Sequence, residues 1–283
     1  MGRSNFIWYE FVHGGHWFSI SASAIAFSTM ILLDINIRWE LLLIIYLLLQ
    51  SIYNYNHYKE IEIDALSKSD RPKHLKKYHH FLILITTLYC IGFLFLLFYY
   101  ANFISFLFGV VLLLIGLLFT NLFKKVTKKV IGFKSLYVAF TLSLLILFTT
   151  FYCSYEINLL SIKLFLLFSL RFVIGASFSD IKDVEVDKKQ DLLTFAVYFG
   201  KDRFLIFLHI LNFITFIPLF LTIVEISSSF LLFLIFTFVY TFYFIQRARN
   251  PKINIQYLTS IIVDGEFIFW PFFLIIGKFL LIQ

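Results

Sequence analysis

Long, nearly uninterrupted apolar runs dominate this sequence, such as LLLIIYLLLQSIY at 41–53 and LFLLFSLRFVIGASFS at 164–179. One bilayer crossing takes about 20 predominantly apolar residues. Because lipid cannot hydrogen-bond to an exposed backbone, such runs must form helices or a closed barrel. Hydrophobic residues make up 60% of the chain and charged residues only 14%, against about 25% charged in soluble domains. The sequence therefore predicts an all-α, polytopic membrane protein.

Nine segments are long and apolar enough to be membrane helices by this criterion. They are 17–35, 39–57, 80–99, 101–123, 135–155, 159–180, 204–224, 228–245 and 257–281. The third and fourth run together, so a tight turn is expected near Ala101–Asn102. No long polar or Pro/Gly-rich stretch interrupts the pattern, and we expect one domain spanning residues 1–283, a bundle of nine transmembrane helices.

Basic residues gather in alternate loops of this predicted bundle. The loops after the second, fourth, sixth and eighth segments carry most of them, whereas the opposite side has only Arg38, Lys163 and Lys278. Cytoplasmic loops carry an excess of Lys and Arg, so the N-terminus is predicted to be cytoplasmic and the C-terminus external. The net charge of +7 then reflects topology, and no nucleic-acid partner is expected. Cys90 and Cys153 lie within apolar runs, which predicts no disulfide framework.

Two acidic clusters occupy this same predicted cytoplasmic side, each at the end of an apolar run. They read NHYKEIEID at 56–64 and DIKDVEVD at 180–187. In continuous helices, the spacing of each cluster would place its members on one face. These members are Asn56, Glu60 and Asp64 in the first cluster, and Asp180, Asp183 and Asp187 in the second.

Like charges this close repel one another, so a cation is expected between them. Mg²⁺ binds through one or two carboxylates together with substrate phosphates. Two facing carboxylate helices could therefore hold Mg²⁺ around a diphosphate, and the six residues are the predicted metal ligands. The alternative is that the acids only pair with neighbouring lysines.

The two clusters resemble the motifs of the UbiA superfamily of intramembrane prenyltransferases. The first family motif is N-D-x-x-D-x-x-x-D followed by Arg-Pro, and here it reads NHYKEIEIDALSKSDRP. The second is D-x-x-D-x-x-x-D with later Thr and Gly, and here it reads DIKDVEVDKKQDLLTFAVYFGK, with Thr194 and Gly200. The sequence departs from the pattern at four positions, which are His57 and Glu60 in place of Asp, and Val186 and Asp191 where Gly is common.

The resemblance implies Mg²⁺-dependent transfer of an isoprenyl group from a prenyl diphosphate to a lipophilic acceptor within the membrane. By analogy, the acceptor is an aromatic quinone precursor, a glycerol phosphate, a tetrapyrrole or a sugar phosphate. The implied diphosphate ligands are Asn56, Lys68, Arg71 and Lys134, and the implied catalytic residues are Asp64, Asp183 and Asp187. The protein would be a multi-pass integral protein of the cell (inner) membrane, surrounded by membrane lipid, with its active site facing the cytoplasm.

Two other functions fit parts of the pattern. A membrane terpene cyclase would use the same diphosphate site without an acceptor. A cation-coupled transporter would also need acidic residues, but its site is expected near the bilayer midplane, whereas these acids lie at the predicted cytoplasmic edge.

Further polar residues lie near or within predicted spans. Arg171 could pair structurally with Asp264 or Glu266, or these residues could belong to the site. The segment HGGH at 13–16 could hold a metal, although interfacial histidines beside Trp17 explain it more simply.

Overall fold

The computed structural model describes residues 3–64, 70–119, 123–227 and 230–281, and all regular elements in these ranges are helices. Each of the nine predicted segments overlaps a long helix of this described part. These helices are α2 (His16–Leu32), α3 (Trp39–Asp64), α5 (His79–Tyr100), α6 (Phe103–Leu118), α8 (Phe133–Tyr152), α9 (Leu159–Ser179), α12 (Lys201–Ile226), α13 (Leu231–Ala248) and α15 (Asp264–Leu281).

The chain has the helices of a multi-pass integral membrane protein. Among the described residues, six helical segments are long and apolar enough to cross a bilayer, namely Arg71–Tyr100, Phe133–Tyr152, Leu159–Lys189, Lys201–Val224, Leu231–Ala248 and Ile255–Leu280. A seventh is formed if α1 (Arg3–His13) and α2, which meet at a bend of 54°, make one span. The count of nine spans and the cytoplasmic N-terminus stay predictions.

The turn expected between the third and fourth segments is present. Helix α5 ends at Tyr100 and α6 begins at Phe103. The side chain of Asn102 accepts a hydrogen bond of 2.8 Å from the backbone N–H of Ser105. An Asn at this position satisfies one of the backbone donors that a helix leaves open at its start, which lets two apolar helices follow one another without a loop.

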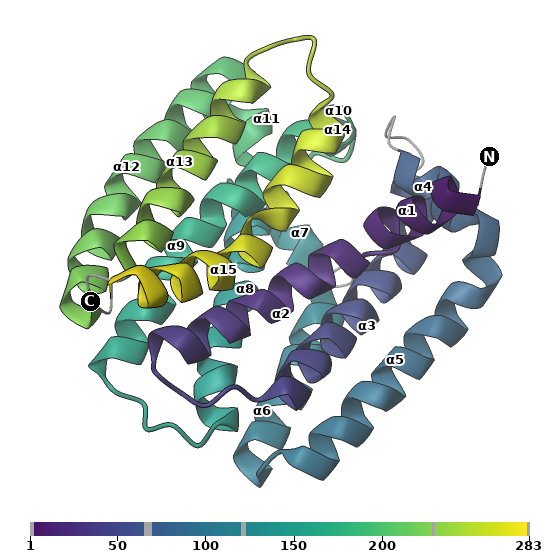
Figure 1. Ribbon diagram of the computed structural model, residues 1–283. Coiled ribbons are helices and arrows are strands. Elements are labelled where there is room, and N and C mark those ends of the chain that lie inside the picture. Colours follow the sequence, from purple (N-terminus) through teal and green to yellow (C-terminus); the bar gives the residue numbers. More distant parts are fainter. Residues whose placement is uncertain (1–2, 65–69, 120–122, 228–229, 282–283) are drawn as a thin grey trace.

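The bundle is closed by its first and last long helices. Helix α2 packs against both α3 and α15, and α12 packs against α13. Helix α5 packs mainly on α3 and lies at the outer edge of the bundle (Figure 1). Large aromatic side chains fill the interior between these helices, including Phe148, Phe172 and Trp270.

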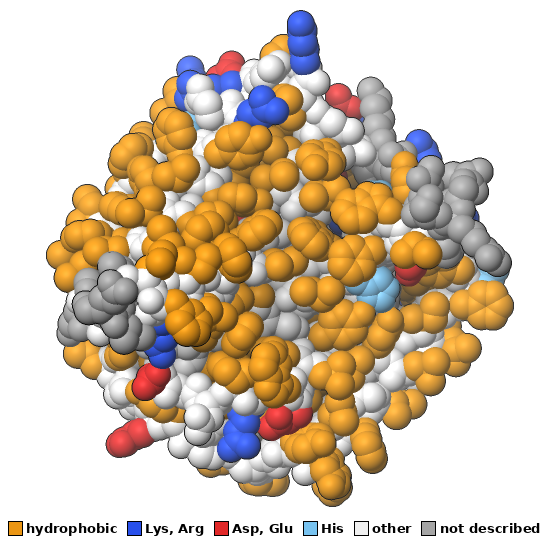
Figure 2. Space-filling view, viewed as in Figure 1, with side chains coloured by type: hydrophobic (Ala, Val, Ile, Leu, Met, Phe, Trp, Pro, Cys, Tyr) orange, Lys and Arg blue, Asp and Glu red, His pale blue; other side chains and the backbone are white. Residues whose placement is uncertain are grey.

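Apolar side chains also cover the outside of the molecule. In Figure 2, hydrophobic side chains spread over the middle of the face, and most charged ones lie toward its upper and lower margins. Exposed residues such as Phe98, Phe103 and Phe279 belong to this surface. A soluble monomer rarely exposes so much contiguous apolar surface, whereas a bilayer would cover it.

Arg171 ties three helices together inside the bundle. From α9 its guanidinium donates to Asn212 Oδ1 on α12, and to the Thr237 carbonyl (3.0 Å) and Thr241 hydroxyl (2.8 Å) on α13. Glu266 is the acid whose charge acts on it. Arg171 is therefore a structural residue, and the pairing with Asp264 considered above is wrong.

Several short helices lie at one end of the bundle. They are α4 (Asp70–Leu75), α10 (Val184–Lys189), α11 (Phe195–Phe199) and α14 (Ile255–Tyr257) (Figure 1). Both acidic motifs adjoin this end. At the other end, Lys278 donates a 2.7 Å hydrogen bond to Asp34, and this hydrogen bond, together with the positive charge of Lys278, lowers the pKa of that exposed carboxyl.

Candidate functional site

A polar cavity of about 280 Å³ opens where α3, α4, α8, α9 and α15 meet. Its charged and polar lining includes His57 and Arg71 from the first motif region and Asp180 and Asp183 from the second. The two motif regions, more than 100 residues apart in the chain, therefore converge on one space. Lys134, Lys182 and Asp264 also line it.

The second acidic motif does not continue α9 as a regular helix. Helix α9 ends at Ser179, and a tight 3₁₀ turn, η3 (Asp180–Asp183), leads into α10. This turn keeps Asp180 and Asp187 close enough to share one cation. Lys134 Nζ lies 2.9 Å from Asp180 Oδ1 and 3.6 Å from Asp187 Oδ1. Ser135 adds a hydrogen bond of 2.7 Å to the other oxygen of Asp180.

Loop contacts place Lys134 at the start of α8. Gly132 has φ +70°, a conformation that favours glycine, and its N–H donates to the Leu193 carbonyl at 2.7 Å. The N–H of Leu193 in turn donates to the carbonyl of Thr127, at the end of α7 (Lys124–Thr127). Asp191 has φ +56°, so this position, too, has a backbone that suits glycine.

Three charged side chains of the cavity lack a direct partner. Lys182, Asp183 and Asp264 make no hydrogen bond or ion pair with any other described side chain, although Lys182 and Asp264 interact through space. Unpaired charges are costly away from bulk water. Their presence in one cavity therefore indicates a site that receives a charged ligand.

Asp264 owes its position to an irregular helix. A π-helical segment, η5 (Leu258–Val263), precedes it, and such bulges are frequent at functional sites. Side chains from other helices satisfy two carbonyls here, with Trp17 Nε1 donating to Ile261 at 3.0 Å and the Tyr240 hydroxyl to Ile262 at 2.8 Å.

Sequence reasoning left the role of Asp264 open and did not single out Lys182. The available signal for Lys182 was its place between two motif acids.

An apolar cavity of about 200 Å³ adjoins the polar one. It lies between α3, α6 and α8, and its lining includes Leu48, Leu49, Ile52, Leu112 and Leu145. The two cavities share five lining residues, which are Phe18, Tyr53, His57, Val138 and Leu142. A charged cavity and an apolar cavity therefore lie side by side, bordered by the same side chains.

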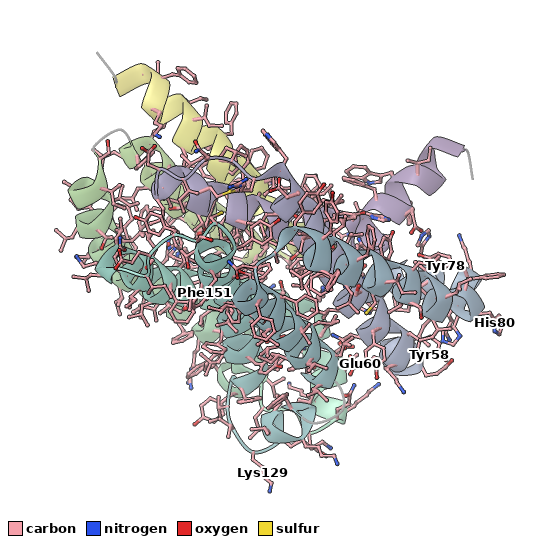
Figure 3. The ribbon with its side chains drawn as sticks, turned by 90° about the horizontal axis from the view of Figure 1, so that it is seen from below. Tyr58, Glu60, Tyr78, His80, Lys129 and Phe151 are labelled. Carbon is pink, nitrogen blue, oxygen red and sulfur yellow. The ribbon has the colours of Figure 1, made fainter. Side chains whose placement is uncertain are left out.

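The predicted residues of the first motif separate in the structure. Asn56 lines the apolar cavity and its amide donates to the Gly116 carbonyl at 3.5 Å. Glu60 is half-buried and, in the described structure, lines neither cavity; Figure 3 shows it beside Tyr58 on α3. The side chain of Asp64 and all of Lys68 lie outside the described residues. Among the predicted residues of this region that the structure describes, Arg71 lines the polar cavity.

The second motif carries donors that suit Mg²⁺. No three His, Cys, Asp or Glu side chains of the described part converge on a common metal position, but Mg²⁺ usually takes one or two carboxylates and completes its shell with water and substrate phosphate. Asp183 faces the cavity without a partner, and Asp187 Oδ2 is buried without a hydrogen bond from a described group. Hard oxygen donors with open lone pairs fit this cation.

The chain belongs to the UbiA prenyltransferase family, whose model matches residues 16–261. This confirms the resemblance drawn from the two motifs, and prenyl diphosphate binding and prenyl transfer are the activities of the family. No curated protein sequence matches the chain.

Solved structures show the same fold at low sequence identity. A UbiA homologue from Archaeoglobus fulgidus bound to GPP and Mg²⁺ superposes with a TM-score of 0.67 at 18% identity, covering 95% of this chain and 98% of that one. An apo UbiA homologue from Aeropyrum pernix K1 gives 0.65 at 12% identity, covering 89% and 96%. A digeranylgeranylglyceryl phosphate synthase gives 0.59 at 18% identity, covering 98% and 99%.

Proposed function

We propose that this protein transfers an isoprenyl group from a prenyl diphosphate to a lipophilic acceptor within the membrane, in a Mg²⁺-dependent reaction. The observation that carries the proposal is that the two cavities adjoin and share wall residues. A prenyl diphosphate has a highly charged head and an apolar tail. The polar cavity offers cations and carboxylates to the head, and the adjoining apolar cavity offers Leu, Ile and Phe side chains to the tail.

Each charged group has a role toward the head. Asp180, Asp183 and Asp187 would hold Mg²⁺, which neutralises charge on the leaving group as a Lewis acid. Arg71 and Lys182 face the cavity and would donate to diphosphate oxygens, as charge-assisted hydrogen bonds. Lys182 extends the predicted set of Asn56, Lys68, Arg71 and Lys134, while Glu60 and Asp64 stay proposed metal ligands of the first motif.

Lys134, which is ion-paired with Asp180 and Asp187, has two functions in this scheme. Without a ligand it neutralises Asp180 and Asp187. With Asp180 and Asp187 holding Mg²⁺, the Lys134 ammonium, which lines the polar cavity, would be free to donate to diphosphate oxygens. The same side chain therefore keeps the empty site stable and contributes to substrate binding.

The reaction breaks the carbon–oxygen bond between the prenyl group and the diphosphate, and pyrophosphate leaves with the electron pair. The resulting allylic cation is stabilised by aromatic faces, which Phe18, Tyr53 and Phe172 provide along the cavity wall. The acceptor donates an electron pair to form the new bond and then loses a proton. Asp264 lines the cavity as a carboxylate without a direct partner, and we assign it the role of proton acceptor.

The comparisons support this proposal at the level of the family. One structural relative is bound to GPP and Mg²⁺, another to DMAPP and Mg²⁺, and a third is a prenyl-glyceryl phosphate synthase. A nine-span topology with the N-terminus and active site at the cytoplasmic face of the cell membrane is part of the proposal. The clustering of basic loops supports it.

The test uses purified protein in lipid vesicles with labelled geranylgeranyl diphosphate and Mg²⁺. We expect Mg²⁺-dependent binding and pyrophosphate release, and mass spectrometry of the labelled lipid identifies the acceptor. D183N should lose release, whereas E185Q, an exposed neighbour, should retain it. Release that is unaffected by D183N would overturn the site assignment. A labelled hydrocarbon or alcohol formed from the diphosphate alone would identify a cyclase.

A further inference from the structure

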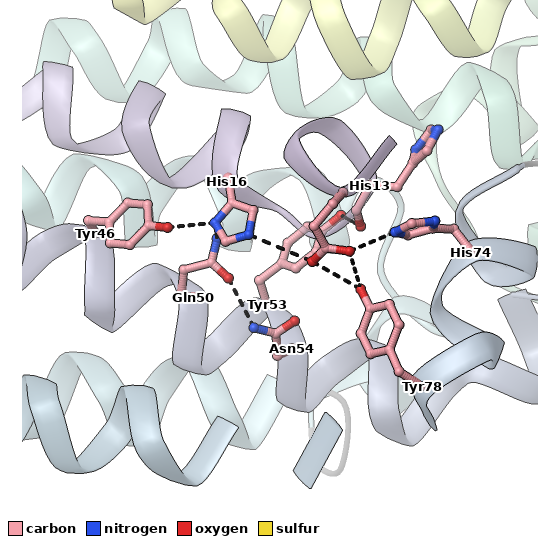
Figure 4. A network of polar contacts seen from close by, with 9 residues as sticks. His13, His16, Tyr46, Gln50, Tyr53, Asn54, His74 and Tyr78 are labelled. Carbon is pink, nitrogen blue, oxygen red and sulfur yellow. Dashed lines mark hydrogen bonds and ion pairs between the residues drawn. The ribbon is translucent and has the colours of Figure 1, made fainter. Parts of the chain in front are cut away.

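A second polar cluster surrounds Glu10 on α1, outside the cavity described above. His74 Nε2 donates to Glu10 Oε2 at 2.7 Å, and the Tyr78 hydroxyl lies 3.0 and 3.2 Å from the two carboxylate oxygens. His16 Nε2 is 3.7 Å from Glu10 Oε1. Figure 4 shows His16, His74 and Tyr78 directed toward this common centre. Neither Glu10 nor His74 lines the polar or the apolar cavity.

The cluster is anchored to α3 through His16. Its Nδ1 is 2.5 Å from the Tyr46 hydroxyl and accepts a hydrogen bond of 3.1 Å from Gln50. Asn54 continues the chain by donating to Gln50 at 2.9 Å. Glu10 therefore lies next to a His16 side chain whose position is fixed by hydrogen bonds to Tyr46 and Gln50.

The same cluster holds the helix that carries Arg71. Helix α4 spans only Asp70–Leu75, so His74, three residues after Arg71, lies about one turn further on. His74 is 2% exposed and bonded to Glu10. On its other side α4 is fixed by Leu75, which packs with Ile61 and Leu82. A helix this short has little stability of its own, so these contacts set its position.

A second connection runs from α1 to Arg71 through Tyr53. The Arg71 guanidinium lies over the Tyr53 ring, 5.3 Å from its centre. The Tyr53 hydroxyl donates to the carbonyl of His13 at 3.2 Å, at the end of α1. Helix α1 is therefore connected to Arg71 in two ways. One runs through His74 on α4, and the other runs through the Tyr53 ring under the guanidinium.

The HGGH segment makes this arrangement possible. Gly15 has φ +84°, and a Cβ atom there would lie 2.4 Å from the Tyr53 ring. A Cβ atom on Gly14 would lie 2.5 Å from Glu10. The two glycines let the chain bend between α1 and α2 while Glu10 and Tyr53 approach closely. His16 contacts Glu10, and the His13 carbonyl accepts from Tyr53. No group of metal ligands is found here among the described residues.

We propose that Glu10 is a positioning residue for the diphosphate: by holding His74 and Tyr78 it fixes α4, so that Arg71 points into the polar cavity. The inference rests on the proposed function, because it assumes that Arg71 binds the diphosphate. It assigns a role to the N-terminal helix, whose described side chains line neither cavity.

The first experiment measures the Kd of geranylgeranyl diphosphate with Mg²⁺ and the rate of pyrophosphate release for E10Q in lipid vesicles. We expect the Kd and KM to rise about 10-fold, with kcat at saturation changed less than about 3-fold. E10D, which restores the charge, should recover part of the affinity. E62Q is the matched control, because Glu62 is exposed and pairs with Lys76 at 3.5 Å on the neighbouring surface. Y78F, which removes only a hydroxyl, is a milder variant should E10Q fail to fold, and should raise KM in the same direction.

The second experiment asks whether the effect passes through Arg71. R71A alone should weaken binding, and E10Q should add nothing further in the R71A background, because a positioning effect needs the positioned group. Additive losses in the double variant, or an E10Q Kd equal to that of the wild type, would overturn the inference. Wild-type protein that does not bind the diphosphate would instead overturn the proposed function, and with it this role.

Discussion

The ammonium of Lys134 lies 2.9 Å from one carboxylate oxygen of Asp180, while Ser135 donates to the other oxygen at 2.7 Å. Asp187 is the second carboxylate that Lys134 reaches, at 3.6 Å. Both acids are almost completely buried. One lysine therefore neutralises two of the three acids of the second motif in the chain without ligand, and those acids are the proposed Mg²⁺ ligands.

Removing this lysine should make the protein depend on Mg²⁺ for stability. K134A leaves two buried carboxylates without their cation, which we expect to cost about 3 kcal/mol of unfolding free energy. Because Mg²⁺ would then bind carboxylates that Lys134 no longer holds, added Mg²⁺ should raise the Tm of K134A more than that of the wild type. Thermal unfolding in detergent with and without chelator measures both effects. K128A, at an exposed position, is the control, and an equal Mg²⁺ shift in all three proteins would contradict the prediction.

Replacing Arg171 should affect folding and leave the diphosphate site intact. Its guanidinium satisfies Asn212, Thr241 and the Thr237 carbonyl across three helices. R171A removes this donor from all three groups and removes the positive charge that acts on Glu266, and we expect a loss of about 3 kcal/mol. Unfolding measurements check the loss, and substrate titration of the folded fraction should give the wild-type Kd. A folded R171A protein with weakened diphosphate binding would place Arg171 in the site.

Filling the apolar cavity should discriminate between donors by chain length. L145W introduces a large ring into the wall of that cavity. The Kd for geranylgeranyl diphosphate should rise at least about 10-fold, and that for dimethylallyl diphosphate should change less than about 3-fold, because a short tail buries less apolar surface. L136W is the matched control on the same helix, where Leu136 is exposed. If both donors lose affinity equally, the tail binds elsewhere.

Asp264 should matter for transfer more than for binding. D264N keeps the shape of the side chain but removes a base, so turnover should fall roughly 100-fold. The Kd for the diphosphate should stay within about 3-fold, because the phosphate oxygens have Arg71, Lys134 and Lys182 as partners. Single-turnover assays with labelled donor separate the two quantities, with D34N at the opposite end as control. A large loss of affinity without a loss of turnover would move Asp264 to the diphosphate site.

The fold class and the outline of the site follow from features that one sequence displays. Apolar runs of bilayer length predict the helices, and every predicted segment overlaps one. The acids at 180–187 could be assigned to a ligand site because charges so closely spaced need a counter-ion. Family membership followed from two motifs, each recognisable by local spacing.

The tertiary structure decided which polar groups share a cavity. Spacing along a helix gives the face on which Asn56 and Glu60 lie, but not what that face meets, and Asn56 borders the apolar cavity while Glu60 borders neither. In the sequence, Asp264 and Arg171 are both charged residues within apolar segments, and pairing with each other was one alternative for them. Only the packing of α9 against α12 and α13 gave Arg171 its neutral partners, while the π-helical segment placed Asp264 in the polar cavity. The sequence by itself determined where apolar and charged groups lie along the chain, because burial in lipid and repulsion between charges act locally. Contacts between distant helices depend on how the whole bundle packs, and they decided which of those charges face one another.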